Sequence, residues 1–191
     1  NYLKSCMNAI QGDDYTLVTE LIDVKSFAQA YIIYDLFKNP DTNYSSLYFY
    51  KDAGGKLVCG PVWDFDMSIG NVSHKGNGVF ESTETLWSKE QCPWFKALLN
   101  HEEFVSLVGE ELTEYAPIIR ATIKKEIEYA LSYSEAYKKN FEKWNILGKQ
   151  TWSNPGYLVS ITTWEEHIEY VENYLEESLQ YLEYVYCSNE N

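Results

Sequence analysis

Helical periodicity in the second half of the chain is the feature that most limits what this sequence can fold into. Residues 163–187 carry an apolar stripe with glutamates between its members, which is typical of an amphipathic helix packed against a larger body. The stripe consists of Trp164, Ile168, Val171, Tyr174, Leu175, Leu179, Leu182 and Val185. Similar patterns predict further helices over residues 94–100, 102–115, 117–133 and 135–145, with Pro117 suited to a first helical turn.

The first half of the chain predicts two more helices. Residues 2–10 suggest a short helix that stops near Gly12. Asp23 is a suitable N-cap for a second helix, whose apolar residues are spaced to bury it on most sides. This helix is expected to stop at Asn39-Pro40, because a residue before proline is disfavoured in the helical region.

Strand formers occur in one region only. Residues 47–50 and 57–62 are rich in β-branched and aromatic residues and flank the turn residues Asp52, Gly54 and Gly55. They predict a β-hairpin packed on the helix that starts at Asp23, with Pro61 at a sheet edge or bend. The expected fold is therefore α+β and mostly helical.

Acidic residues flank this hairpin region in the sequence. Asp64 and Asp66 come directly after the second strand in WDFD, and Asp41 lies in the loop before the first strand. The sequence thus predicts all three acids at the same end of the hairpin. Each acid is explained either as a turn cap or as part of a cleft that holds a cation. The segment 71–85 is predicted to be a loop, and a long loop beside acids is often a functional lid.

The spacing of these acids fits phosphoryl transfer. In protein kinases, a catalytic aspartate is followed five positions on by a metal-binding asparagine, and a later aspartate binds magnesium. Here Ser46 stands five positions after Asp41, and Asp64 is followed by Phe65.

Composition excludes some other classes of protein. The net charge of −14 disfavours binding to nucleic acid or to an anionic membrane surface, although solubility alone accounts for most acidic surfaces. No apolar run approaches the roughly 20 residues of a membrane span. The four cysteines have no zinc-site spacing. They permit two disulfides in any of three pairings, or a buried thiol at Cys59.

The run NPDTNYSSLYFYKDAGGKLVCGPVWDFDMSIGN, residues 39–71, resembles the core signature of the CotH family of spore-coat kinase-like proteins. The shared features are N-x-D, S-x-Y-x-Y-K-D, a glycine turn, G-P-x-W-D-F-D and G-N. Residues 86–104 and 140–148 are similar as well, so the resemblance covers most of the chain.

This resemblance implies the C-lobe of an atypical protein kinase, which transfers phosphate from ATP to Ser or Thr of a protein substrate with Mg²⁺ or Mn²⁺. Asp41 matches the catalytic acid, Asp64 the metal-binding acid, and Asp66 and Ser46 further metal ligands. Ser46 replaces the asparagine of the kinase pattern, and no glycine-rich phosphate loop or strand lysine precedes residue 23.

We therefore expect residues 1–191 to be one domain, the C-terminal part of a CotH kinase-like domain whose nucleotide-covering N-lobe is absent. The resemblance also implies an extracellular or cell-surface location. The alternative is a non-catalytic scaffold or binding module derived from the same fold. The sequence identifies neither the protein substrate nor a surface-protein partner.

Overall fold

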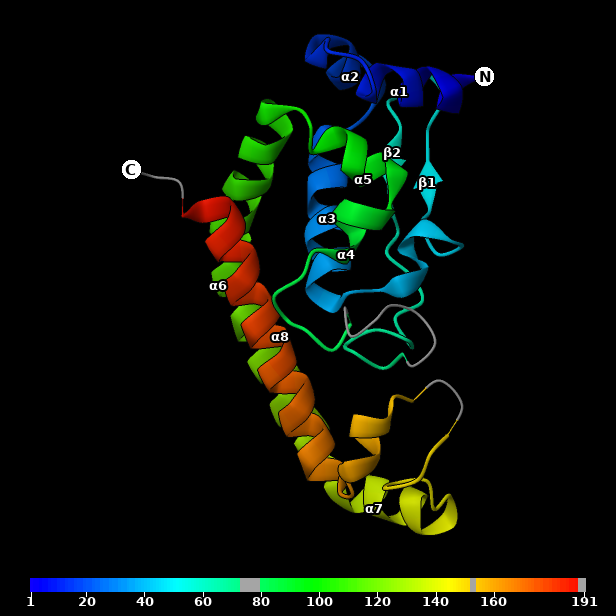
Figure 1. The fold of residues 1–191 in the computed structure, drawn as a ribbon, viewed down its shortest axis with the longest axis vertical. Helices are drawn as coiled ribbons and strands as arrows, with labels where there is room; N and C mark the ends of the chain where they lie inside the picture. Colours follow the sequence, from blue (N-terminus) through cyan, green and yellow to red (C-terminus); the bar gives the residue numbers. More distant parts are fainter. Residues whose placement is uncertain (73–79, 152–153, 189–191) are drawn as a thin grey trace.

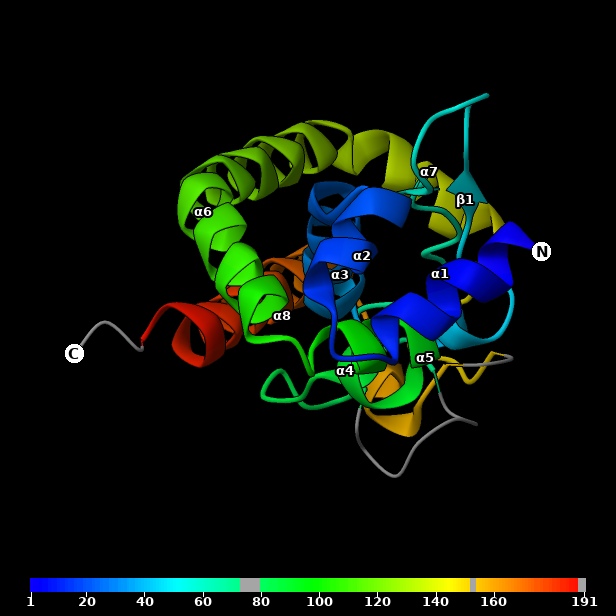
Figure 2. The ribbon, with the colours of Figure 1, turned by 90° about the horizontal axis from the view of Figure 1, so that it is seen from above.

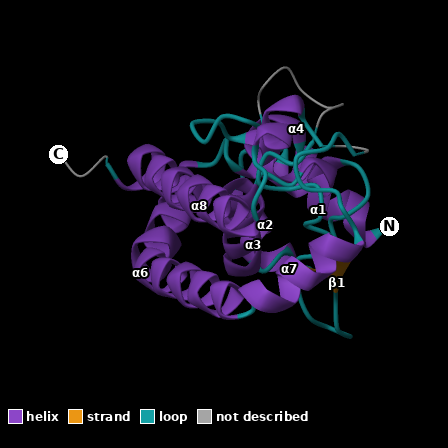
Figure 3. Cartoon of the chain, turned by 90° about the horizontal axis from the view of Figure 1, so that it is seen from below, coloured by secondary structure: helices purple, strands orange, loops and turns teal. Residues whose placement is uncertain are grey.

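The computed structural model describes residues 1–72, 80–151 and 154–188 of the chain, and these are mostly helical (Figure 1). The α-helices are α1 (Tyr2–Ile10), α2 (Tyr15–Leu21), α3 (Val24–Phe37), α4 (Trp87–Gln91), α5 (Pro93–Leu98), α6 (Glu102–Ser132), α7 (Ser134–Lys143) and α8 (Trp164–Cys187). The remaining elements are the 3-10 helices η1 (Pro40–Asn43) and η2 (Gly156–Ser160) and the strands β1 (Phe49–Tyr50) and β2 (Val58–Cys59). The predicted mostly helical α+β class is confirmed, and Figure 3 shows how little of the described chain is strand.

Helix α3 lies in the upper part of the molecule in Figure 1, with α6 and α8 on one side and the short helices α4 and α5 on the other (Figures 1 and 2). Its start is confirmed, because the Asp23 carboxylate accepts a hydrogen bond from the Ser26 N–H at 3.0 Å. Its stop is confirmed too: the helix ends at Phe37, and Asn39 is extended before Pro40. The helix buries Phe27, Tyr31, Tyr34 and Leu36 completely or nearly so.

The predicted hairpin is present but short. Strands β1 and β2 pair antiparallel, with Phe49 opposite Cys59, over two residues each rather than over residues 47–50 and 57–62. The Phe49 ring stacks on Phe27 of α3 with centroids 5.5 Å apart. The prediction that the hairpin packs on α3 is therefore confirmed.

Helices α6 and α8 run antiparallel and form the most extensive helix pair of the described chain (Figure 1). The prediction of two helices divided at Pro117 is wrong, because α6 continues through that proline. Proline removes one backbone hydrogen bond from a helix interior. Packing along α8 and burial of the neighbouring Ala116 offset that loss, and Figure 2 shows α6 as a curved helix. Helices α2 and α4 were not predicted at all.

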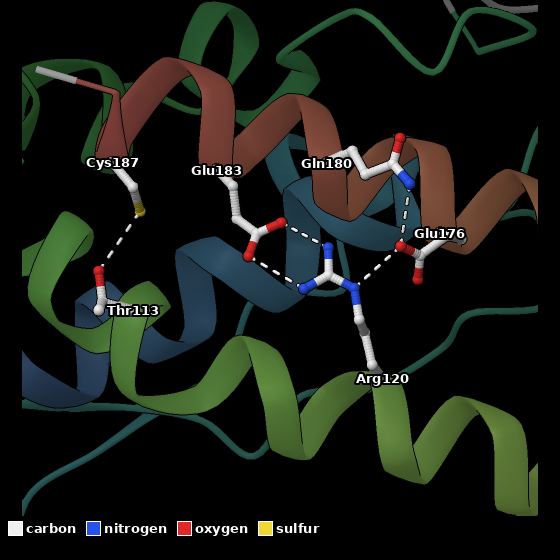
Figure 4. A network of polar contacts seen from close by, with 6 residues as sticks. All are labelled: Thr113, Arg120, Glu176, Gln180, Glu183 and Cys187. Carbon is white, nitrogen blue, oxygen red and sulfur yellow. Dashed lines mark hydrogen bonds and ion pairs between the residues drawn. The ribbon is translucent and has the colours of Figure 1, made fainter.

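The only arginine of the sequence joins these two helices (Figure 4). The Arg120 guanidinium donates to both carboxylate oxygens of Glu183 and, through Nε, to Glu176 at 2.9 Å. A bidentate Arg–carboxylate pair of this kind fixes the orientation of the guanidinium and also pairs its charge. Near the start of α6, Gly109 lets this helix approach the end of α8 closely. A Cβ on Gly109 would lie 2.7 Å from the Tyr186 carbonyl oxygen.

Two expectations from composition can be compared with the described residues. All four cysteines are free, and Cys59 is a buried thiol whose pKa is raised by burial and by Cys92. The disulfide alternative is not found. Within residues 1–72, 80–151 and 154–188, every helix is too short or too polar to cross a bilayer.

Part of the predicted loop and lid, residues 73–79, lies outside the described residues.

Candidate functional site

The turn after α3 carries Asp41, the predicted catalytic acid. Asp41 is half-buried in η1. Its backbone carbonyl accepts hydrogen bonds from the N–H groups of Tyr44, Ser45 and Ser46 at 2.9, 3.0 and 3.1 Å. This tight turn returns the chain toward the end of the hairpin, so that Ser46 lies buried there.

Asp64, the predicted metal-binding acid, emerges after β2 with an exposed side chain. The Ser46 hydroxyl donates to the Asp64 carboxylate at 3.2 Å, so these two predicted site residues are brought together. Asp64 also has a left-handed backbone, with φ of 67°. That conformation is uncommon for residues other than glycine, although aspartate and asparagine tolerate it better than most. Such backbone strain is concentrated at functional sites in proteins.

Asn39 joins the two acid-bearing segments. Its amide oxygen accepts from the Asp41 N–H at 3.0 Å. Its amide nitrogen donates to the carbonyl oxygens of Asp64 at 2.8 Å and Trp63 at 3.3 Å. Asn39 itself is fully buried, so its amide has no access to water and depends on these three part-buried bonds. One side chain therefore fixes the backbone of both acids, a role that the sequence analysis did not assign to it.

Phe65 separates Asp64 from Asp66 and fixes their segment on α3. Its ring stacks on Tyr34 at a centroid distance of 5.5 Å and meets Phe37 edge-on at 5.2 Å. Asp66 itself is exposed, and its backbone carbonyl accepts from the Asn71 side chain at 3.2 Å. The acid segment, defined here as residues 64–71, is thus anchored by aromatic packing while both carboxylates face solvent.

The donor atoms of the three predicted ligands fit a hard cation better than a soft one. Asp64, Asp66 and Ser46 offer only oxygen, which suits Mg²⁺ and Mn²⁺. In the described part of the chain, no three or more His, Cys, Asp or Glu side chains form a metal-holding group. That finding is compatible with Mg²⁺, which is usually bound through one or two carboxylates together with substrate phosphates and water. These donor types fit the metal that the resemblance implies, and the structure brings two of the three predicted ligands, Ser46 and Asp64, into contact.

Two buried charges lie at the C-terminal end of α3, Asp35 in its last turn and Lys38 at its C-cap, and the sequence analysis missed them. The Asp35 carboxylate accepts from the backbone N–H groups of Ser88 at 2.7 Å and Lys89 at 3.3 Å. It supplies the cap that α4 lacks from its own N-cap residue. Lys38 donates from Nζ to the Thr83 carbonyl at 3.1 Å and to Ser178 of α8 at 3.2 Å. The signal available in the sequence was a charged residue, Asp35, in the apolar second half of α3, with Lys38 three positions later at the C-cap.

Burial alters the titration of both groups. It raises the pKa of Asp35 to about 6, against the hydrogen bonds from Ser88 and Tyr31 and the charge of Lys38, which lower it. Burial also lowers the pKa of Lys38 to about 8, with Asp35 acting in the opposite sense. The native state therefore holds the Asp35 proton more tightly than the unfolded chain does.

This difference predicts a pH dependence of stability. The contribution from Asp35 is fully present below its unfolded pKa and is lost as pH rises through about 6. Between about pH 5 and about pH 7, wild type should lose about 1 kcal/mol more unfolding free energy than Asp35→Asn. Urea unfolding of both proteins at these pH values measures the difference. If the unfolding free energies of the two proteins changed equally with pH, the raised pKa of Asp35 would be contradicted.

The comparisons with known proteins add one finding. The model of the family described as CotH kinase protein matches residues 1–182 of the 191-residue chain. No curated protein and no solved structure matches the chain.

Proposed function

Because the chain belongs to the CotH kinase protein family, we propose that it carries the acid and metal half of a phosphoryl-transfer site. The proposed reaction moves the terminal phosphate of ATP to a Ser or Thr hydroxyl of a protein substrate. The proposed fold type is the C-lobe of an atypical protein kinase. The 191 residues contain no glycine-rich phosphate loop, so the proposal concerns the acids and not the covering of the nucleotide.

Each acid has a distinct role in this proposal. Asp41 accepts the proton of the attacking hydroxyl or positions that hydroxyl, as the catalytic-loop aspartate of kinases does. Asp64 would hold Mg²⁺ or Mn²⁺, with Asp66 and the Ser46 hydroxyl as further oxygen ligands. The cation, when bound, neutralises charge on the phosphates.

The observation that carries the proposal is the buried amide of Asn39. It bonds to the Asp41 N–H and to the Asp64 carbonyl, which fixes the two acid-bearing backbones relative to each other. Phosphoryl transfer depends mainly on such positioning and on electrostatic stabilisation. Turn capping alone gives no reason for one buried side chain to join both segments.

Metal binding gives the first test. Mn²⁺ at about ten times its Kd should stabilise the native state by about 1.4 kcal/mol and raise the melting temperature. Asp64→Asn should abolish this response while the metal-free protein stays folded, because asparagine tolerates the left-handed backbone and can still accept from Ser46. The exposed Asp13 provides the control, and Asp13→Asn should respond like wild type. An equal response in wild type and Asp64→Asn would remove the metal assignment.

Transfer of labelled phosphate from ATP to a Ser/Thr-containing protein gives the second test. Asp41→Asn should abolish transfer and keep the Mn²⁺-dependent rise in melting temperature, since Asp41 is assigned to the hydroxyl and not to the metal. This test needs a form of the protein that includes a nucleotide-covering lobe. Metal binding without any transfer by that form would favour the alternative, a non-catalytic scaffold or binding module. The replacement of the kinase asparagine by Ser46 is the observation that supports this alternative.

We also propose an extracellular or cell-surface location, supported by the resemblance to spore-coat proteins. The protein substrate or partner is not identified by the chain.

A further inference from the structure

Two tyrosine hydroxyls from the far helical part of the chain reach the end of the acid segment. Tyr157 in η2 donates to the Gly70 carbonyl at 2.6 Å, and Tyr170 in α8 donates to the Ile69 carbonyl at 3.1 Å. The two hydroxyl oxygens lie 3.3 Å apart. The tyrosine pair, Tyr157 and Tyr170, therefore holds two successive carbonyls of the segment that carries Asp64 and Asp66.

The held residues are connected to Asp66 by short-range hydrogen bonds. The Asn71 N–H donates to the Ser68 carbonyl at 3.0 Å, and its side chain donates to the Asp66 carbonyl at 3.2 Å. The Ile69 N–H donates to the Phe37 carbonyl of α3 at 2.8 Å. A shift at residues 69 and 70 would thus move Asn71, and with it the backbone of Asp66.

The contact is tight and chemically stable. A Cβ on Gly70 would lie 2.4 Å from the Tyr157 hydroxyl oxygen and 2.5 Å from that of Tyr170. Burial raises the pKa of both tyrosines, which remain protonated donors at neutral pH. Ile69 has a left-handed backbone with φ of 55°, a rare conformation for a β-branched residue. Such a strained conformation persists only where the surrounding contacts hold it in place.

We propose that the tyrosine pair positions the acid segment for cation binding, so that η2 and α8 set the affinity of a metal site more than 85 residues earlier in the chain. This inference rests on the proposed function. Tyr157 and Tyr170 are positioning residues, since they act through the backbone at Ile69 and Gly70. Outer-shell partners of this kind orient metal ligands in many proteins.

Mn²⁺ affinity tests the proposal. Calorimetry on the full chain should show that the double variant Tyr157→Phe/Tyr170→Phe binds Mn²⁺ about tenfold more weakly than wild type, with smaller losses in each single variant. Phenylalanine keeps the ring packing and removes only the hydroxyls. Tyr2→Phe is the matched control, because the Tyr2 hydroxyl donates at 2.6 Å to the Leu21 carbonyl, outside the acid segment. Its Kd for Mn²⁺ should equal that of wild type.

The readouts separate positioning from general stability. A lower melting temperature with an unchanged Kd in the double variant would overturn the positioning role and leave the proposed function standing. Absence of Mn²⁺ binding by wild type would overturn both. If the double variant does not fold, the two single variants provide the same comparison. A Tyr2→Phe loss as large as that of the double variant would also overturn the proposal.

Discussion

Replacement of Asn39 by alanine is expected to lower the free energy of unfolding by about 4 kcal/mol. The variant leaves the N–H of Asp41 and the carbonyls of Trp63 and Asp64, all in part-buried bonds, without their amide partner. An unsatisfied group costs about 1–3 kcal/mol when it is buried, and access of water and relaxation of the turn recover part of the sum. Urea unfolding measures the loss directly. Because the amide also fixes Asp64, the remaining folded protein should bind Mn²⁺ more weakly than wild type.

Asn71→Ala is the control for this prediction. The Asn71 side chain donates one bond, at 3.2 Å, to the Asp66 carbonyl, and the residue is only half-buried. Its loss should cost about 1 kcal/mol. Equal losses for Asn39→Ala and Asn71→Ala would contradict the role assigned to Asn39, because burial and the number of bonds would then make no difference.

Replacement of Gly70 by alanine is expected to cost a similar amount, about 4 kcal/mol. The new Cβ would collide with the tyrosine pair and lie 3.1 Å from the Phe80 carbonyl oxygen. Both hydroxyls would have to move away from the carbonyls that they hold. The φ of +74° adds a backbone penalty for any L-residue with a Cβ. Thermal and urea unfolding should both report the loss.

Gly54→Ala separates the two causes. Gly54 has nearly the same φ, +76°, but a Cβ there would have no heavy atom within 4 Å. This variant therefore carries the backbone penalty alone, about 1 kcal/mol. Removing the hydroxyls with Tyr157→Phe/Tyr170→Phe should relieve part of the Gly70→Ala loss, since the close contacts involve those oxygens. If Gly70→Ala were no worse than Gly54→Ala, tight packing at Gly70 would be disproved.

Local patterns in the sequence were sufficient to predict the position of those helices whose ends are set by neighbouring residues. Helix α1 spans the predicted residues 2–10, and α3 begins at its Asp23 cap and ends before Pro40. Helix α8 begins directly after its N-cap Thr163, whose side chain and that of Glu166 form a capping box. In each case the signal and the structure that it predicts lie within four residues of each other.

The same reasoning fails where a distant element changes the local outcome. Pro117 predicts a helix start, but packing against α8 carries α6 through it. Helix α4 has no side-chain cap of its own, and its cap comes from Asp35, 53 residues earlier than Ser88. No window along the sequence contains both halves of such an interaction.

The candidate site divides in the same way. The sequence by itself indicated which residues supply the chemistry of the proposed site: Asp41 as the acid, and Ser46, Asp64 and Asp66 as oxygen ligands, at spacings that resemble the kinase pattern. Only the tertiary structure decided how they are held, through Asn39 between the two segments and the tyrosine pair at the end of the acid segment. The physical reason is that donor chemistry is a property of a side chain and can be read from its type. Positioning depends on buried hydrogen bonds between residues up to 101 apart, which exist only once helices α3 and α8 have packed.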